Sequence, residues 1–405
     1  MTKSSSSGEC IIDGQELIEI IDLGMHPFAD TFIPEERFYE SEPVFPLKCG
    51  LCKVCGLVQL IVLTNPDDRY GMYDYSYTSS NSEYARSHWT AFADETITSS
   101  PLDTKVLEIG SNDGFLLGRF LAKGCKVLGF DSSESMSKIA IDHGIPTINS
   151  IFCLDEAKRL QASESNFDVI IANNVLNHSN NPLDFLNGVE SLLADNGRFI
   201  FEVPYWLSSV QTGNFDQIYH EHISYFTISS LSKIIQHTKL TISDIQINEY
   251  HGGSLRVTLA RGREFQDEKW SHLIEEELNA SLENLDTYRV FMTEVRKKRS
   301  KLLSKIHQIL LAEPNALIIL AGAAAKANTF INYYKLDSTL IHCITDNSPH
   351  KIGKYTPLSR IPIVADQALT GLENIYVLTT AWNIVDIIKD RIAKSNPTAK
   401  VLSYE

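Results

Sequence analysis

The central part of the chain alternates short apolar runs with longer segments in which apolar residues recur every three or four positions. The apolar runs predict strands at Lys105–Ile109, Lys126–Phe130, Asp168–Ala172 and Arg198–Val203. The periodic segments predict helices at Phe115–Lys123, Ser135–His143 and Leu183–Ala194. Because strands that alternate with helices form a parallel sheet covered on both faces, this region predicts a Rossmann-like α/β unit.

Further helices and one hairpin flank this unit. Helical periodicity extends over Ser82–Ser99 and Ser229–His237. The strands Ile242–Asn248 and Ser254–Ala260 have the spacing of a hairpin. Two charged segments with helical periodicity follow, at Glu264–Asn279 and Leu282–Leu310.

A second α/β pattern occupies the C-terminal part of the chain. Strands are predicted at Ala316–Leu320, Leu340–Thr345, Ile375–Leu378 and Lys400–Leu402, and a turn of small residues separates the first of them from a helix. The first 70 residues contain five prolines and predict short strands and turns. We therefore expect three domains, at 1–70, 71–262 and 263–405, the first too small for a large core and stabilised by a metal.

Composition and charge narrow the class of protein. The chain has 405 residues, which is too long for one ordinary core. Its formal net charge of −15 argues against a nucleic-acid partner, which favours a basic surface. The sequence has no apolar run long enough to span a membrane, and its first residues lack the apolar core of a signal peptide. We expect a cytosolic monomer.

Four of the seven cysteines fall within the first 55 residues, which favours a metal site over disulfides in a reducing compartment. Cys52 and Cys55 have the spacing of a zinc knuckle, and Cys10 supplies a third sulfur. Asp13 stands where a partner cysteine for Cys10 is usual. Either Asp13 or Cys49 completes the tetrahedral set, or the site binds zinc weakly or not at all; in every version the domain is structural.

A glycine-containing turn after the first central strand predicts a cofactor site. Gly110 and Gly114 allow close approach of the backbone to a ligand, and Asp131 ends the next strand, where a carboxylate accepts hydrogen bonds from ribose hydroxyls. A dinucleotide fingerprint has glycine where Asn112 stands, and acidic side chains such as Glu108 repel phosphate. The cationic, phosphate-free cofactor S-adenosylmethionine fits better. Asn173 ends a further strand and lines the same cleft; the plain alternative is an ordinary strand–turn–helix junction.

The run Tyr219-His220-Glu221-His222 concentrates acid–base side chains. In an extended backbone, Tyr219 and Glu221 share one face and the two histidines the other. A neutral imidazole takes up a proton near pH 7, a carboxylate orients it, and a phenol donates to a developing oxyanion. His178 is expected to reach the same cleft. The alternative is a hydrogen-bonded core cluster, since structural networks also gather titratable groups.

These motifs together resemble the S-adenosylmethionine-dependent sugar C-methyltransferases of deoxysugar biosynthesis, over nearly the whole chain. The N-terminal part is similar through Leu23–Asp30 and Cys52–Leu60. The central part is similar through Glu108–Gly114, Ala172–Leu176, the Tyr-His-Glu-His run and His251–Arg256. The C-terminal part is similar through Gly322–Lys326, Asp346–Lys351 and Trp382-Asn383.

The resemblance implies a substrate, a reaction and roles for individual residues. Family members act on nucleotide-linked 4-keto-6-deoxy sugars: a base removes the proton alpha to the keto group, usually at carbon 3, and the enolate takes up the methyl group. By motif match His222 is the base, Glu221 orients it, and Tyr219 and His178 contact the enolate oxygen. A tyrosine among Tyr73, Tyr75 and Tyr77 closes over the site. The implied substrate-binding residues are Ser254, Lys326, Asn328, His350 and Lys351.

The chain departs from the family pattern at several positions. Besides Asp13, Ala327 stands where glycine is usual, and Asp131-Ser132 replaces a common Glu-Pro pair. Two rival functions are a nicotinamide-dependent sugar-nucleotide oxidoreductase and a non-catalytic sugar-nucleotide-binding protein. The turn from Ala321 to Lys326 lacks the Gly-x-Gly-x-x-Gly spacing that the first rival needs.

Overall fold

The computed structural model describes residues 5–6, 8–71, 78–80, 82–97, 103–164, 166–262 and 267–402. The chain divides into two compact units. The first unit comprises residues 1–18, 50–209 and 222–283, and the second comprises residues 19–49, 210–221 and 284–405. The division falls inside the acid–base run, between Glu221 and His222.

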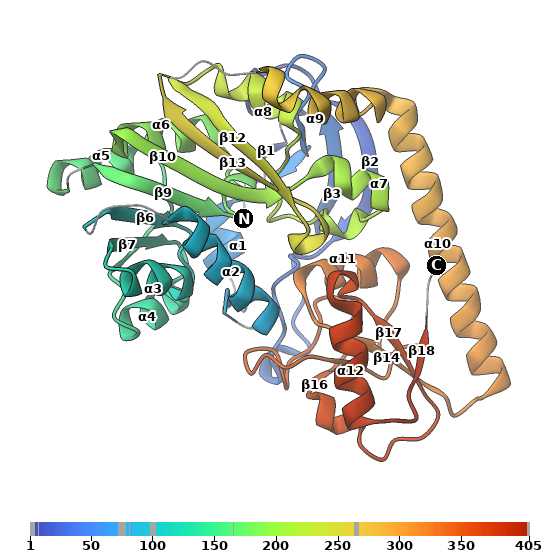
Figure 1. Cartoon of the computed structure of the whole chain (residues 1–405). Coiled ribbons are helices and arrows are strands. Elements are labelled where there is room, and N and C mark those ends of the chain that lie inside the picture. The colour runs from blue at the N-terminus through green and yellow to red at the C-terminus, as the bar shows by residue number, and fades with distance from the viewer. Residues whose placement is uncertain are drawn as a thin grey trace. The chain divides into compact units, whose positions relative to one another are not determined.

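A seven-stranded sheet forms the centre of the first unit, in the order β12-β13-β10-β9-β6-β7-β8 (Figure 1). Its strands are β6 (Lys105–Ile109), β7 (Lys126–Asp131), β8 (Thr147–Asn149), β9 (Phe167–Asn173), β10 (Leu193–Pro204), β12 (Leu240–Asn248) and β13 (Ser254–Arg261). Strands β6 to β10 are parallel, whereas β12 and β13 form the expected antiparallel hairpin and β13 pairs antiparallel with β10. This arrangement confirms the predicted Rossmann-like sheet.

Helices cover both faces of this sheet. In Figure 1, α2, α3 and α4 lie on one side of the sheet and α5 and α6 on the other. The helices of the unit are α1 (Pro66–Gly71), α2 (Glu83–Thr96), α3 (Phe115–Ala122), α4 (Glu134–Asp142), α5 (Leu154–Ser163), α6 (Pro182–Leu192), α8 (Ile228–Ile235) and α9 (Asp267–Asn279); α7 (Trp206–Thr212) crosses into the second unit. Helices α1, α5 and α7 and strand β8 are among the elements of this unit that the sequence did not predict. Most predicted helix starts agree within one or two residues, because side chains such as Ser82, Ser133 and Thr227 accept N–H groups of the first turn.

The core of the first unit consists of the apolar stripes predicted from the sequence. Trp89 and Phe92 of α2 and Phe120 of α3 pack in one cluster with Val106 of β6 and Ile171 of β9. The parallel strands are apolar almost without interruption because both of their faces are covered. The N-terminal segments add two small ladders, β1 (Ser5–Ser6) with β5 (Val62–Leu63) and β4 (Val58–Leu60) with β11 (Ser224–Tyr225).

The second unit contains a five-stranded parallel sheet in the order β16-β15-β14-β17-β18. Its strands are β14 (Leu317–Ala321), β15 (Cys343–Thr345), β16 (Ile363–Val364), β17 (Ile375–Thr379) and β18 (Lys400–Leu402), and its helices are α10 (Leu285–Ala312), α11 (Ala325–Tyr334) and α12 (Val385–Ser395). The neighbouring strands β2 (Ile18–His26) and β3 (Phe45–Leu51) precede them in the chain. This sheet confirms the predicted second Rossmann-like unit. Strand β15 is shorter than predicted because Asp337 accepts N–H groups from residues 339 to 341 and forms a turn there.

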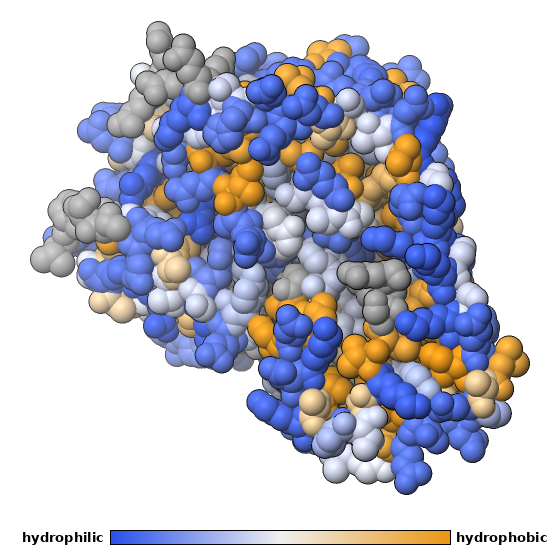
Figure 2. Space-filling view, turned by 45° about the vertical axis from the view of Figure 1, so that its right-hand side comes forward, coloured by the Kyte–Doolittle hydropathy of each residue, from blue (hydrophilic) through white to orange (hydrophobic). Residues whose placement is uncertain are grey.

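The short 3₁₀ helices are η1 (Glu35–Arg37), η2 (Leu176–His178), η3 (Phe215–Gln217), η4 (Tyr250–Gly252), η5 (Asp366–Leu369) and η6 (Trp382–Ile384). The face drawn in Figure 2 is largely hydrophilic, with hydrophobic residues in scattered groups (Figure 2). Among the described residues, no helix is both long and apolar enough to cross a membrane.

Candidate functional site

The glycine turn of the predicted cofactor site joins β6 to α3. Gly110 and Gly114 have φ values of +73° and +76°, in the left-handed region that favours glycine. The Gly110 N–H donates to the Phe130 carbonyl of the neighbouring strand at 2.6 Å, and a Cβ on Gly110 would lie 2.3 Å from Cγ2 of Val175. The turn therefore requires glycine at position 110 for both its backbone conformation and its packing.

Asp131 at the end of β7 holds this turn in place. Its Oδ2 accepts the Asn112 N–H and its Oδ1 accepts the Ser133 N–H, each at 2.8 Å. Burial raises the pKa of Asp131, and the two backbone donors oppose that rise. Each carboxylate oxygen keeps a lone pair, so the predicted contact with ribose hydroxyls remains chemically available.

Glu108 and Asn173 place unpartnered polar atoms at the carboxyl ends of β6 and β9, which are neighbouring strands. Oε2 of Glu108 and both amide atoms of Asn173 are buried and have no hydrogen-bond partner among the described residues. Burial raises the pKa of Glu108 well above its usual range, and the charges of Asp113 and Asp131 add to the rise. Buried polar atoms without partners are costly, and in an open α/β sheet this edge is where ligands bind. The residues present therefore fit a bound S-adenosylmethionine whose hydroxyl and ammonium groups donate hydrogen bonds.

Asp113, the second acidic side chain of this turn, bonds to the segment that precedes α2. Its carboxylate accepts hydrogen bonds from the hydroxyls of Ser79 and Ser80, at 2.5 Å each, and from the Ser80 N–H at 3.2 Å. Oδ1 of Asn112 accepts the Ser79 N–H at 2.8 Å. The cofactor turn thus anchors residues 79 and 80. The predicted closing residues Tyr73, Tyr75 and Tyr77 lie outside the described residues.

Two of the predicted acid–base residues lie together in the first unit. The rings of His178 and His222 are 5.1 Å apart between centroids; His222 is buried, and His178 is partly buried with its Nε2 atom shielded from solvent. Burial lowers the pKa of His178 well below its usual range, and the nearby His222 and Arg69 lower it further. The environment of His178 therefore favours the neutral form of its imidazole.

The other three residues of the run belong to the second unit and do not form an extended strand. Residues 219 to 221 form a bend and a turn, so alternation of faces does not apply. His220 is fully buried and lies edge-on to the rings of Phe28 and Phe45, at 5.9 and 5.8 Å between centroids. Oε1 of Glu221 accepts the Asp30 N–H at 3.5 Å. His220 therefore has an apolar aromatic environment, in contrast to His222.

The predicted substrate-binding residues differ in burial and in hydrogen-bond partners. Ser254 is buried and donates to the Tyr250 carbonyl at 2.9 Å. In the second unit, Lys351 donates to the Ala323 carbonyl at 2.8 Å, Asn328 donates to the Ala29 carbonyl, and His350 is exposed. Lys326 lies with its ammonium 4.2 Å from the centroid of the Trp382 ring.

Asp216 is a residue that the sequence analysis missed. It is buried in the second unit, its Oδ2 accepts the indole N–H of Trp382 at 2.8 Å, and Oδ1 has no hydrogen-bond partner among the described residues. Burial raises the pKa of Asp216 to about 6, although the positive charge of Lys326 acts to lower it. No spacing rule connects positions 216, 326 and 382, so only the fold reveals this group.

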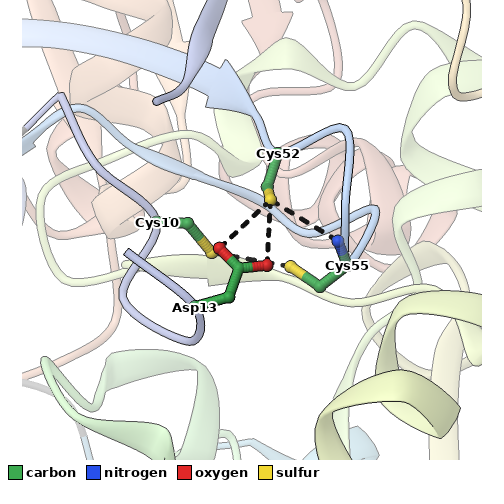
Figure 3. Close-up of side chains that lie close together, drawn as sticks. All are labelled: Cys10, Asp13, Cys52 and Cys55. Atoms are coloured by element: carbon green, nitrogen blue, oxygen red, sulfur yellow. Dashed lines mark hydrogen bonds between the residues drawn. The ribbon is translucent and has the colours of Figure 1, made fainter. Parts of the chain in front are cut away.

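Cys10, Asp13, Cys52 and Cys55 converge in the first unit, with one ligand atom from each lying within 4.8 Å of the others (Figure 3). The sulfurs of Cys10 and Cys55 are 3.5 Å apart, close to the spacing of about 3.8 Å that tetrahedral zinc with Zn–S bonds near 2.3 Å requires. Asp13 accepts from the Cys52 thiol at 3.3 Å. Cys49 is not a member of this group. Of the two candidates for the fourth ligand, Asp13 and Cys49, the structure therefore favours Asp13.

The charges of this group also suit a metal. A hydrogen bond from the Cys55 thiol lowers the pKa of Cys10 to about 7. Burial acts to raise the pKa of Asp13, but donors from the Gln15 N–H and the three thiols outweigh it and lower that pKa. Three sulfurs and one carboxylate oxygen are a donor set that zinc accepts, so the residues present fit a structural zinc ion.

Three family models match successive parts of the chain. They are described as "Putative zinc binding domain" for residues 10–70, "Methyltransferase domain" for residues 81–244 and "C-methyltransferase C-terminal domain" for residues 249–399. The chain carries the three domains of an S-adenosylmethionine-dependent C-methyltransferase. The C-methyltransferase NovU of Streptomyces niveus is 27% identical to it over 387 residues, covering 94% of this chain and 91% of NovU.

Solved methyltransferase structures resemble smaller parts of this C-methyltransferase. Magnesium protoporphyrin IX methyltransferase from Synechocystis PCC 6803, with bound S-adenosylmethionine, is 15% identical with a TM-score of 0.34, and covers 44% of this chain and 79% of its own. The plantazolicin methyltransferase BpumL is 16% identical with a TM-score of 0.37, and covers 49% of this chain and 92% of its own.

Proposed function

We propose that this C-methyltransferase methylates carbon 3 of a nucleotide-linked 4-keto-6-deoxy sugar through an enolate. The observation that carries the proposal is the pair of adjacent imidazoles, His178 and His222, in the unit that also contains the glycine turn. Carbon methylation next to a ketone needs a neutral base that removes a carbon-bound proton, and His222 is suited to that task. The resemblance of the Tyr-His-Glu-His run to the sugar C-methyltransferases supports the choice of substrate.

The cofactor would be held by Glu108, Asp131 and Asn173, with Gly110, Asn112 and Gly114 shaping the turn against it. When bound, S-adenosylmethionine supplies an electrophilic methyl group. The acidic side chains favour a cationic ligand, and the amide of Asn173 has a donor and an acceptor to offer.

The proton and electron balance of the reaction is simple. An imidazole nitrogen of His222 takes the proton from the carbon alpha to the keto group, and the electron pair of that C–H bond forms the enolate. Bound S-adenosylmethionine would then supply its methyl group to the alpha carbon and would leave as S-adenosylhomocysteine. In this scheme Tyr219 and His178 donate hydrogen bonds to the enolate oxygen, and Glu221 orients the base.

The remaining assignments belong to the same proposal. Tyr73, Tyr75 or Tyr77 closes the site, and the sugar nucleotide contacts Ser254, Lys326, Asn328, His350 and Lys351. Zinc binds Cys10, Cys52, Cys55 and Asp13 and stabilises the N-terminal fold without taking part in the chemistry. We propose the division 1–70, 71–262 and 263–405 for the three domains, and a cytosolic monomer that binds neither nucleic acid nor membrane.

Isotope transfer tests this function directly. Purified protein is incubated with S-adenosylmethionine carrying a trideuterated methyl group and a panel of nucleotide-linked sugars, and the products are analysed by mass spectrometry. We expect a gain of 17 mass units, that of CD₃ replacing hydrogen, only with 4-keto sugars; the matched 4-hydroxy sugars serve as controls because they cannot enolise. Reduction of the ketone with a nicotinamide cofactor and no methyl transfer would instead support the oxidoreductase.

A further inference from the structure

Asp216 occupies a special position in the chain because it lies three residues before Tyr219 and five before Glu221. It is the middle residue of η3 and is only 3% exposed. One carboxylate oxygen accepts the Trp382 indole N–H at 2.8 Å, while the other is buried without a hydrogen-bond partner among the described residues. A buried carboxylate is costly unless charge or hydrogen bonds compensate it.

The compensation comes from the carboxyl edge of the second sheet. Lys326 lies in the first turn of α11, which follows β14, and Trp382 follows β17. Strands β14 and β17 are neighbours in register, so their loops emerge side by side. The Lys326 ammonium lies over the Trp382 ring at 4.2 Å, and its charge stabilises the Asp216 carboxylate. The Lys326 ammonium and the Trp382 indole N–H, both at this edge of the sheet, therefore hold the Asp216 side chain.

Further contacts tie the same loop to α11. The Thr329 hydroxyl donates to the Ile218 carbonyl at 3.0 Å, immediately before Tyr219. The ring of Phe215 stacks on Tyr334 at 5.7 Å with an interplanar angle of 6°, and lies 5.1 Å from the Tyr333 ring. All of these residues belong to the second unit. The segment that leads into the acid–base run is thus fixed to α11 at three successive places.

We propose that Asp216 is a positioning residue of the methyl-transfer reaction: held by Trp382 and Lys326, it fixes the loop that carries Tyr219 and Glu221. The proposal rests on the proposed function, because it takes those two side chains as members of the catalytic set. It assigns to the C-terminal domain a task beyond substrate binding. It also gives Lys326 a partner within the protein, in addition to its proposed contact with the sugar nucleotide.

Asp216→Asn tests the proposal, since it keeps the shape and an oxygen for the indole N–H but removes the charge that faces Lys326. Asp366→Asn is the matched control: Asp366 is a buried carboxylate of the same unit, paired with Arg391 at 2.8 Å and outside the loop. Misplacing a reacting group by about 1 Å costs on the order of 100-fold in rate. We expect Asp216→Asn to lower kcat by 10- to 100-fold at nearly unchanged KM for the sugar and unchanged affinity for S-adenosylhomocysteine. The control keeps normal kcat.

Hydrogen–deuterium exchange gives a readout that does not depend on activity. Amides of residues 217–221 should exchange faster in Asp216→Asn than in wild type, while amides of residues 110–114 keep their protection. Trp382→Phe removes only the indole donor, so amides 217–221 should also exchange faster in this variant, but by a smaller factor. This variant replaces Asp216→Asn in the test if Asp216→Asn does not fold.

Each outcome decides between the alternatives. Normal kcat in Asp216→Asn with only a lower melting temperature overturns the proposal, because the residue then serves stability alone. A raised KM with normal kcat and unchanged exchange also overturns it, since Asp216 then affects substrate binding through Lys326 and does not fix the loop. If wild-type protein methylates none of the keto sugars, the proposed function fails, yet the exchange experiment still shows whether Asp216 fixes the loop.

Discussion

Glu108→Gln probes the cofactor site through a buried carboxylate that has one oxygen without a hydrogen-bond partner among the described residues. Glu108 is 5% exposed, one of its oxygens has no hydrogen-bond partner among the described residues, and Asp113 and Asp131 lie near enough to raise its pKa. Glutamine keeps the shape and removes the charge. Glutamine is still a buried polar group, but removing the charge relieves the desolvation penalty of the carboxylate, which is on the order of 1–3 kcal/mol, so we expect the apo variant to be more stable than wild type at neutral pH.

The pH dependence of that gain follows from the direction of the pKa shift. A carboxyl whose pKa is raised by folding contributes stability below its unfolded pKa of about 4.5, and loses it as the pH rises through the folded value. The stability difference between the glutamine variant and wild type should therefore be small near pH 4.5 and grow toward neutral pH. Chemical denaturation over this range measures it, with the exposed Glu164→Gln as the control.

The same substitution, Glu108→Gln, should weaken cofactor binding although it stabilises the apo protein. A hydrogen bond to a charged group contributes about 1.5–3 kcal/mol, so calorimetry should show S-adenosylmethionine binding 10- to 150-fold more weakly to Glu108→Gln. S-Adenosylhomocysteine, which lacks the sulfonium charge, separates loss of the hydrogen bond from loss of Coulomb attraction. Unchanged affinity for both ligands, together with a stability difference that does not vary with pH, would refute this account of the site.

Three further predictions concern the metal, the base and a helix cap. Asp13→Ala should release zinc from the purified protein while Cys49→Ser retains it, as elemental analysis would show; a metal-free wild type contradicts the site. His222→Asn should abolish methylation and stop deuterium uptake at the substrate's alpha carbon in heavy water without changing cofactor affinity, whereas near-normal turnover would place the base elsewhere. Glu277 accepts the Tyr205 hydroxyl, the N–H groups of residues 228 and 229 and the Ser229 hydroxyl. Glu277→Gln should therefore lower the unfolding free energy by about 1.5–3 kcal/mol, and an unchanged denaturation midpoint would contradict this.

Local pattern was sufficient for most of the architecture. The strands from Lys105 and Lys126 and the helix after Gly114 lie where the apolar runs and the glycine turn place them, because side-chain period and backbone conformation are properties of neighbouring residues. The missed elements are short or weakly patterned: β8 has three residues, and α5 has only two buried ones. Such segments are specified by the sheet they pack on, which no local window contains.

The candidate sites likewise combine features that local sequence predicts with features that only the tertiary structure shows. The CxxC spacing and the Gly110 turn are local signals, and the sequence alone predicted a metal site and a cofactor loop at these positions while leaving the fourth ligand open. The choice of Asp13 over Cys49, the separation of His220 from His222 into different environments and the link from Asp216 to Lys326 and Trp382 appeared only in the tertiary structure. Residues far apart in the chain, such as Asp216 and Trp382 at a separation of 166 positions, must be brought together before their distances, burial and charges are defined. Those quantities, and not residue type alone, decide which side chains bind a ligand, which hold other residues in position and which only pack in the core.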